Sequence, residues 1–138
     1  MNKNENFQNP RIIVIQKLYG KFLNEDTDLN FPKHRYKKFI KDVVIGTIER
    51  KELIQKLIDE KLKDNINHNK TELIMKLMIM AAIYEFMFMH KTPIKVIINE
   101  YLKVADSFIG ESQKNFLNAI LDKASKVSRF KNEWIFNY

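Results

Sequence analysis

The sequence predicts an all-α domain, a compact bundle of about six to seven helices packed around one central apolar helix. Only 3 glycines and 3 prolines interrupt 138 residues, which favours long helices over a β architecture with many turns. Apolar residues recur at helical spacing in successive segments. The segment 73–89 is apolar nearly all round, with Lys76 and Glu85 as its only charges. Such a helix is central to a bundle or spans a membrane. This one is short and charged for a span, so we expect no membrane insertion.

The first two helices are predicted from caps and periodicity. Asn9 is placed to cap the first helix, and Pro10 to occupy its first position. Its expected inner face is formed by Ile12, Ile15, Tyr19, Phe22 and Leu23. A polar loop follows at 24–32, and a second helix starts near His34. The inner face of that helix is expected to comprise Tyr36, Phe39, Ile40, Val43, Val44 and Thr47.

A third helical pattern covers 53–62 and is either separate from the second helix or continuous with it. Asn69 followed by Glu72 predicts a capping box that opens the central helix. Thr92 and Pro93 begin the next helix, which is expected to reach Phe108, and a turn at Gly110 leads to the last one. We expect one domain over 1–138, with a flexible N-terminus at 1–8 and an aromatic tail at 129–138.

Charge and composition restrict the classes of function. A net charge of +7 and a pI of about 9.5 suit a polyanionic partner such as nucleic acid, although a lysine-rich proteome would give the same excess. The absence of cysteine excludes disulfides and thiolate metal sites. The first residues lack the apolar core of a signal peptide, so we expect a cytoplasmic protein.

No pattern of catalytic or metal-binding residues is present. His34, His68 and His90 share no ligand spacing, and there is no phosphate-binding glycine loop, zinc-protease motif or nucleophile elbow. The methionines of the central helix could suggest a soft-metal site, but core packing explains them better. They are Met75, Met78, Met80, Met87 and Met89. We therefore predict no enzyme, no metal and no cofactor.

Four motifs in register resemble the NusB family of transcription antitermination factors. Residues 11–19 read RIIVIQKLY, similar to the family's Arg-x4-Gln-x-Leu-Tyr, and residues 81–85 read AAIYE, similar to Leu-Ala-x-Tyr-Glu. Residues 93–100 read PIKVIINE, and residues 115–123 read NFLNAILDK. Those two resemble Pro-x-x-Val-x-Ile-Asn-Glu and Lys-Phe-Val-Asn-Gly-Val-Leu-Asp-Lys. Order and spacing agree over roughly 9–126.

The resemblance implies a two-lobed all-α fold and a non-enzymatic function in transcription. It implies pairing with the ribosomal protein NusE, joint binding of boxA, a single-stranded element of ribosomal RNA leaders, and action in the RNA polymerase antitermination complex. The family's RNA surface maps onto Lys3, Arg11, Gln16, Tyr19, Ser112, Gln113, Lys114, Asn115 and Phe116. Arg11 and Lys114 are the expected phosphate ligands, whereas Tyr19 and Phe116 fit base stacking and core packing equally well.

The resemblance implies that the surface for NusE includes Tyr84, Glu85, Asn99 and Glu100. Asn99 and Glu100 could equally stabilise helix ends by hydrogen bonds. The family usually has an arginine cluster at the first helix, and this chain offers only Arg11 and Lys3. A second hypothesis is therefore a NusE-binding module that has weak or lost RNA binding.

Two further segments are not explained by the resemblance. A basic cluster near the second helix either compensates for the phosphate binding of the missing arginines or is a solvated helix face. Its members are Lys33, Arg35, Lys37, Lys38 and Lys41. The aromatic tail is predicted to fold back onto a patch that the short 24–32 loop leaves uncovered between the first two helices. The alternative is that the tail docks onto a partner or a second copy of the chain.

Overall fold

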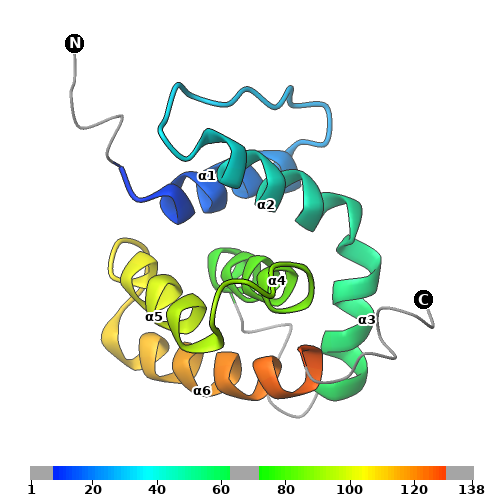
Figure 1. The fold of residues 1–138 in the computed structure, drawn as a ribbon, viewed down its shortest axis with the longest axis vertical. Helices are drawn as coiled ribbons and strands as arrows, with labels where there is room; N and C mark the ends of the chain where they lie inside the picture. Colours follow the sequence, from blue (N-terminus) through cyan, green and yellow to red (C-terminus); the bar gives the residue numbers. More distant parts are fainter. Residues whose placement is uncertain (1–7, 63–71, 130–138) are drawn as a thin grey trace.

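The computed structural model describes residues 8–62 and 72–129. Within these residues it contains six α-helices and no strand, which confirms the predicted all-α class (Figure 1). The helices are α1 (Pro10–Leu23), α2 (Lys37–Glu49), α3 (Lys51–Lys61), α4 (Leu73–Phe88), α5 (Ile94–Ala105) and α6 (Glu111–Ser128). Lys3, Asn69 and the aromatic residues 130–138 lie outside the described residues. The predicted packing of the tail therefore stays a prediction.

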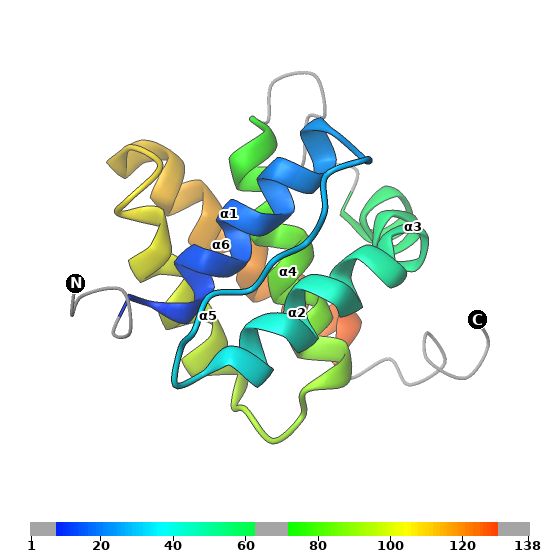
Figure 2. The same ribbon diagram turned by 90° about the horizontal axis from the view of Figure 1, so that it is seen from above.

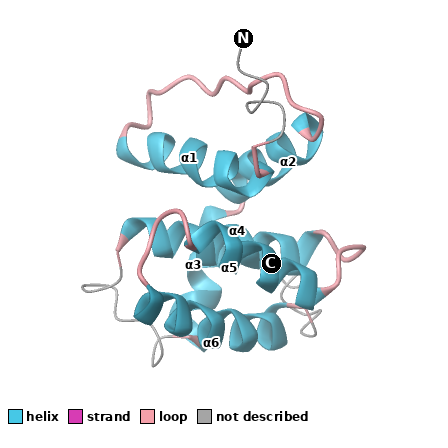
Figure 3. Ribbon diagram, turned by 90° about the vertical axis from the view of Figure 1, so that its left-hand side faces the viewer, coloured by secondary structure: helices cyan, strands magenta, loops and turns pink. Residues whose placement is uncertain are grey.

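Helix α4 is the central helix, as predicted. It contacts each of the other five helices, with α1 and α2 on one side and α5 and α6 on the other (Figure 3). Its side chains are buried all round, including four of the five methionines assigned to the core. Those four are Met75, Met78, Met80 and Met87. Because every face of α4 meets another helix, an apolar surface all round is the arrangement that excludes most water.

Helix α1 begins as predicted but buries a different face. The backbone N–H of Arg11 donates to Asn9 Oδ1 at 2.9 Å, and Pro10 occupies the first turn. The buried apolar residues are Ile13, Val14, Ile15 and Leu18. Tyr19 and Leu23, which were assigned to the inner face, are 38% and 63% exposed. The run of four apolar residues at 12–15 fits several faces of a helix, so contacts with α2 and α4 decide which one is buried.

Several boundaries differ from the sequence prediction. Helix α2 starts at Lys37 and not near His34, because the His34 ring accepts the Tyr36 N–H at 2.9 Å and holds these residues in a turn. Tyr36 is consequently half-exposed and not part of the inner face. Helices α2 and α3 are separate, since Arg50 ends one and precedes the other. This break turns α3 away from α2 and down the side of the bundle (Figure 1).

The ends of α4 and α5 also need correction. Helix α4 begins at Leu73 with Glu72 as its N-cap residue, so Glu72 does not occupy the third helical position that a capping box from Asn69 requires. Helix α5 ends at Ala105, and Phe108 lies in the following turn, half-buried against the core. Pro93 and Gly110 stand immediately before α5 and α6, as the sequence predicted.

The segment 24–36 has no helix and lies across α1 and α2 (Figure 2). Its two apolar residues, Leu29 and Phe31, are partly buried against the core. The loop therefore covers much of the patch that was expected to remain open between the first two helices. A small cavity lies at the C-terminal ends of α1 and α2.

Candidate nucleic-acid interface

Arg11 is at the centre of a buried polar cluster, which is defined by Arg11, Glu85 and Tyr101. Its Nε donates to Glu85 Oε2 at 3.0 Å and its Nη2 to Glu85 Oε1 at 2.6 Å. This is the bidentate geometry that suits a guanidinium and a carboxylate. Arg11 is 7% exposed, and its guanidinium lies 4.7 Å from the centre of the Phe39 ring. One cation thereby links α1 with α2 and α4.

Tyr101 completes the cluster from α5. Its hydroxyl donates to Glu85 Oε2 at 2.5 Å, and both side chains are fully buried. Burial and the neighbouring Glu85 carboxylate raise the pKa of Tyr101 well above its usual value of 10.0. For Arg11, burial is the largest single influence and would lower the pKa, but the hydrogen bond to Glu85 and the charges of Tyr101, Glu85 and Glu100 together outweigh it, so the pKa is raised. Both groups therefore keep their protons at neutral pH.

The cluster corrects two sequence predictions. Arg11 was expected to contact phosphate, but its donors are directed at Glu85 and its side chain is enclosed. Glu85 was assigned to the partner surface, yet its side chain is fully buried and has no access to a partner in this structure. Glu100 is partly exposed and lies 3.9 Å from Arg11 Nη1, while Lys103 Nζ is 3.0 Å from its other oxygen. Asn99 is exposed on α5.

The first turn of α6 presents most of the predicted RNA-binding residues at the surface. Ser112 and Asn115 are exposed, and Phe116 is 37% exposed. Lys114 Nζ is 2.8 Å from Asp106 Oδ1, and this hydrogen bond raises the pKa of Lys114. Gln113 Oε1 accepts the Gly110 N–H at 3.3 Å, so its carbonyl oxygen is used at the helix start and its NH2 group is the part left for a ligand.

On helix α1, Gln16 and Tyr19 are both exposed. Core packing was an equally good interpretation of Tyr19 and Phe116, but both rings expose more than a third of their surface. Helices α1 and α6 both begin on the left side of Figures 1 and 2. Between them the two helices carry two exposed aromatic rings, one lysine and several amide and hydroxyl groups, which are groups suited to the bases and phosphates of single-stranded RNA.

Tyr84, a predicted partner residue, is wedged between α4 and α2. A Cβ atom at Gly46 would lie 2.2 Å from its Cζ, so only glycine leaves room for the ring in this position. Tyr84 also lies 5.2 Å from the Phe88 ring, and the Arg50 guanidinium is 4.8 Å from the Phe88 centre. Burial and the nearby Asp42 carboxylate raise the pKa of Tyr84. The result is a half-buried row of aromatic and cationic groups along the α2–α4 edge.

Arg129 has a structural role that the sequence did not reveal. It was counted with the aromatic tail, but its guanidinium donates to four backbone carbonyls at the end of α4 and just beyond it. These are Phe86 O at 2.9 Å, Thr92 O at 2.7 Å, and Glu85 O and Met89 O at 3.1 Å each. Burial lowers the pKa of Arg129. A cation at a helix C-terminus satisfies free carbonyls and interacts favourably with the helix dipole.

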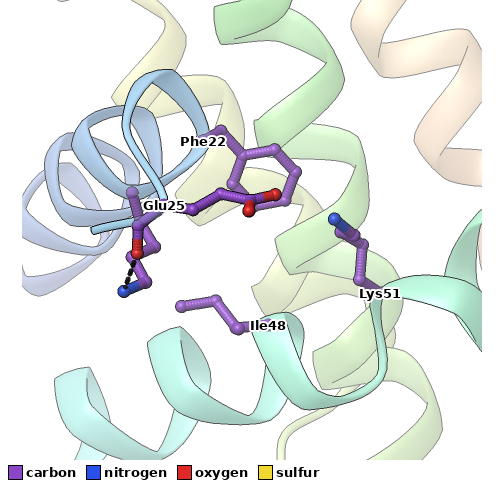
Figure 4. Close-up of a pocket in the computed structure, with 5 residues that line it drawn as sticks. Phe22, Glu25, Ile48 and Lys51 are labelled. Atoms are coloured by element: carbon purple, nitrogen blue, oxygen red, sulfur yellow. Dashed lines mark hydrogen bonds between the residues drawn. The ribbon is translucent and has the colours of Figure 1, made fainter. Parts of the chain in front are cut away.

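A small cavity of about 200 Å³ lies at the C-terminal ends of α1 and α2 (Figure 4). Phe22 and Ile48 form its apolar wall, and Glu25, Lys21 and Lys51 surround it. Lys21 Nζ already donates to the carbonyls of Glu25 and Thr27, at 2.6 and 2.9 Å, and Lys51 Nζ is 5.4 Å from the Phe22 ring centre. Its volume is below that of ordinary ligand pockets. We therefore regard this cavity as a packing gap under the 24–36 loop.

Within 8–62 and 72–129, no group of three acidic, histidine or cysteine side chains is arranged to hold a metal ion. The described helices also include none that is both long and apolar enough to cross a membrane.

A model of the NusB family matches residues 8–126, which run from just before α1 to near the end of α6. The chain belongs to the NusB family. The match covers the buried polar cluster, the α2–α4 edge and the start of α6, and it stops before Arg129.

Individual NusB proteins give the same assignment. The chain is 30% identical over 91 residues to the transcription antitermination protein NusB of Bradyrhizobium diazoefficiens, covering 66% of this chain and 55% of that protein. It is 31% identical over 87 residues to the protein of that name from Bacillus thuringiensis, covering 61% and 64%. The aligned stretch thus spans a little over half the length of these relatives. A solved structure of T. maritima NusB, 24% identical, shares the fold with a TM-score of 0.74 over 91% of this chain and 94% of that one.

Proposed function

We propose that this chain is a non-enzymatic, RNA-binding transcription antitermination factor that acts in the bacterial cytoplasm. In this proposal it binds boxA RNA together with the ribosomal protein NusE and helps RNA polymerase read through terminators. The support is membership of the NusB family and the name that its relatives carry, transcription antitermination protein. The net charge of +7 is consistent with a polyanionic partner.

The observation that carries the RNA-binding part is the exposure of the Tyr19 ring on α1 and of the Phe116 ring near the start of α6. An aromatic ring left in water on a basic protein is suited to stack on an unpaired base, and such stacking does not require a particular sequence. Ser112, Asn115 and the NH2 group of Gln113 are polar groups of the kind that bind base edges. Lys114 lies beside them and supplies the positive charge for a phosphate.

A titration of boxA RNA with the purified protein, with and without NusE, tests this proposal. We expect Phe116→Ala to weaken RNA binding about fivefold or more, through loss of one stacked base. Lys114→Gln should lower the slope of log affinity against log salt by about 0.7, the value for one phosphate of a single strand. Lys126→Gln, on the same helix but three turns away, is the matched control and should leave affinity nearly unchanged. Equal affinity of wild type and Phe116→Ala would contradict the assignment.

A second candidate function is favoured by the position of Arg11. Since its guanidinium is engaged by Glu85, the α1 surface loses the cation that was expected to hold phosphate. A chain that contacts NusE through Tyr84, Asn99 and Glu100 but binds RNA weakly would fit this arrangement. The same titration decides between the two: NusE binding without any gain of boxA affinity in the joint complex would select the interaction module.

A further inference from the structure

Most of the excess positive charge of the protein is concentrated in one short segment. Residues 29–41 contain five basic residues and no acidic one, so they account for five of the seven net charges. These basic residues are Lys33, Arg35, Lys37, Lys38 and Lys41. Charge elsewhere is mixed: α3, for example, carries Glu52, Asp59 and Glu60 among its lysines. The segment is flanked by Asp28 and Asp42, so its net positive charge is local to the residues between them.

The cations of this segment are available to a ligand. All five are exposed. Lys38 is paired with Asp42 at 2.8 Å, but none of the other four has an acidic group of the described residues within ion-pair distance. We define the α2 basic surface as Lys33, Arg35, Lys37 and Lys41 together with Tyr36. Solvated lysines of this kind can neutralise phosphates and thereby release counterions from the nucleic acid.

Tyr36 adds an aromatic group to the α2 basic surface. It is 50% exposed, and the Arg35 guanidinium lies 5.3 Å from its ring centre. A tyrosine with an arginine beside it is a combination that stacks on unpaired bases. Nothing in core packing explains this exposed ring, since the inner face of α2 consists of other residues.

His34 fixes the α2 basic surface to the start of α1. Its Nδ1 accepts the Tyr36 N–H at 2.9 Å, so the ring proton is on Nε2, which donates to the Gln8 carbonyl at 2.7 Å. In both Figure 1 and Figure 2 the start of α1 lies between the start of α2 and the start of α6. The α2 basic surface is thereby held next to the start of α1, and RNA bound at the candidate turn of α6 would have to extend past α1 to reach it.

We propose that the α2 basic surface binds the phosphate backbone of single-stranded RNA that flanks the boxA element, with Tyr36 stacking on one base. This rests on the proposed function and extends it, because it makes the bound RNA longer than the boxA core. Recognition here is by charge and stacking, so it does not depend on the flanking sequence.

The test compares two charge-matched triple variants in the presence of NusE. Lys33→Gln/Lys37→Gln/Lys41→Gln removes three cations of the α2 basic surface. Lys56→Gln/Lys61→Gln/Lys126→Gln removes three exposed cations from α3 and the end of α6, on the other side of the molecule. Each variant is titrated with the boxA core alone and with the core extended by about ten unstructured nucleotides on either side, a length that one binding surface can contact.

We expect wild type and the control variant to bind the extended RNA more tightly than the core. The α2 variant should bind the core normally but lose this gain, with a salt slope on the extended RNA lower by about two units for three phosphates. Tyr36→Ala should lose part of the gain, whereas Tyr36→Phe, which keeps the ring, should retain it. Melting curves of each variant establish that the fold is unchanged.

Four results would overturn the inference. If wild type binds core and extended RNA with equal affinity, or if both triple variants lose the same affinity, the α2 basic surface is not an RNA site, although the proposed function stands. If the α2 variant keeps its RNA affinity but no longer binds vesicles containing phosphatidylserine, the surface serves a lipid headgroup instead. If wild type binds neither RNA, the proposed function fails and this inference fails with it.

Discussion

The buried polar cluster and the α2 basic surface use positive charge in opposite ways. In the cluster, Arg11 is enclosed between α1, α2 and α4, and its charge is balanced by Glu85. On the α2 basic surface, Lys33 and Lys37 are solvated and have no acidic partner among the described residues. The first arrangement holds helices together, and the second leaves charge for a ligand. A count of basic residues, or even the position of a family arginine, does not distinguish them.

The physical difference is the cost of removing water from a charge. Burying an ion pair removes the hydration of both ions, and only close hydrogen bonds between the two ions offset that free-energy loss. Removal of one partner is therefore severely destabilising. A solvated lysine keeps its hydration and contributes little to stability. Substitutions in the two regions should therefore affect different measurements, unfolding in one case and RNA affinity in the other.

The largest expected effect is on the buried pair. Glu85→Leu leaves the Arg11 charge buried without its partner, and Arg11→Met leaves the Glu85 carboxylate in the same position. We expect each to lower the free energy of unfolding by about 3–5 kcal/mol. The measurement is urea unfolding followed by circular dichroism.

The double variant Arg11→Met/Glu85→Leu sharpens the comparison, because it buries no unpaired charge. It should lose clearly less stability than the sum of the single variants. Strict additivity of the two losses would show that the pair does not hold α1 onto α4 as its geometry indicates.

The next largest loss of stability is expected at Arg129, a second cation that is partly buried. Arg129→Met removes the donors for four carbonyls around the end of α4. We expect a loss of about 1.5–3 kcal/mol, since charged hydrogen bonds contribute more than neutral ones and the carbonyls are left without this partner. Lys126→Met, one turn earlier on α6 and exposed, serves as the control in the same unfolding experiment. A similar midpoint for both variants would mean that other groups replace Arg129.

A smaller effect is expected from the pH dependence of Tyr101. The folded-state pKa of its hydroxyl is raised above the unfolded value of about 10, so folding favours the protonated form. The resulting stability is fully present below about pH 10 and is lost as the pH rises from there through the folded-state pKa. Tyr101→Phe should be less stable at neutral pH, through loss of the bond to Glu85, but should decline less steeply between pH 9 and 11. Parallel pH profiles for the two proteins would contradict this.

The smallest effect on stability should come from the α2 basic surface. Lys33→Gln/Lys37→Gln/Lys41→Gln removes neighbouring like charges from solvent, so the melting temperature should stay the same or rise slightly at low salt. The rise should vanish at about 1 M salt, where such repulsion is screened. A marked fall in melting temperature would place these lysines among the groups that hold the fold.

The sequence by itself determined the helices and the central position of α4. A helix that is apolar on every face, such as 73–88, is removed from water only if other segments pack on every side of it. The central position can therefore be predicted without knowing which segments those are. Local signals fixed several boundaries for the same reason: Asn9 and Pro10 start α1, and Gly110 precedes α6. The residues 112–116, which the family motifs predict to bind RNA, lie at the start of α6, and Ser112, Asn115 and Phe116 are exposed there.

The tertiary structure alone decided which residues of these helices are buried and which charges are free. The run of apolar residues at 12–15 allows several inward faces, and only packing against α2 and α4 exposes Tyr19 and encloses Arg11. Glu85 lies 74 residues from Arg11 in the chain, so no local pattern could pair them. Tyr36 was assigned inward by periodicity, but His34, which contacts Gln8 26 residues away, accepts the Tyr36 N–H and holds these residues in a turn, which leaves the Tyr36 ring exposed. Periodicity depends on neighbours in sequence, whereas burial and ion pairing depend on distances between segments that only the folded chain defines.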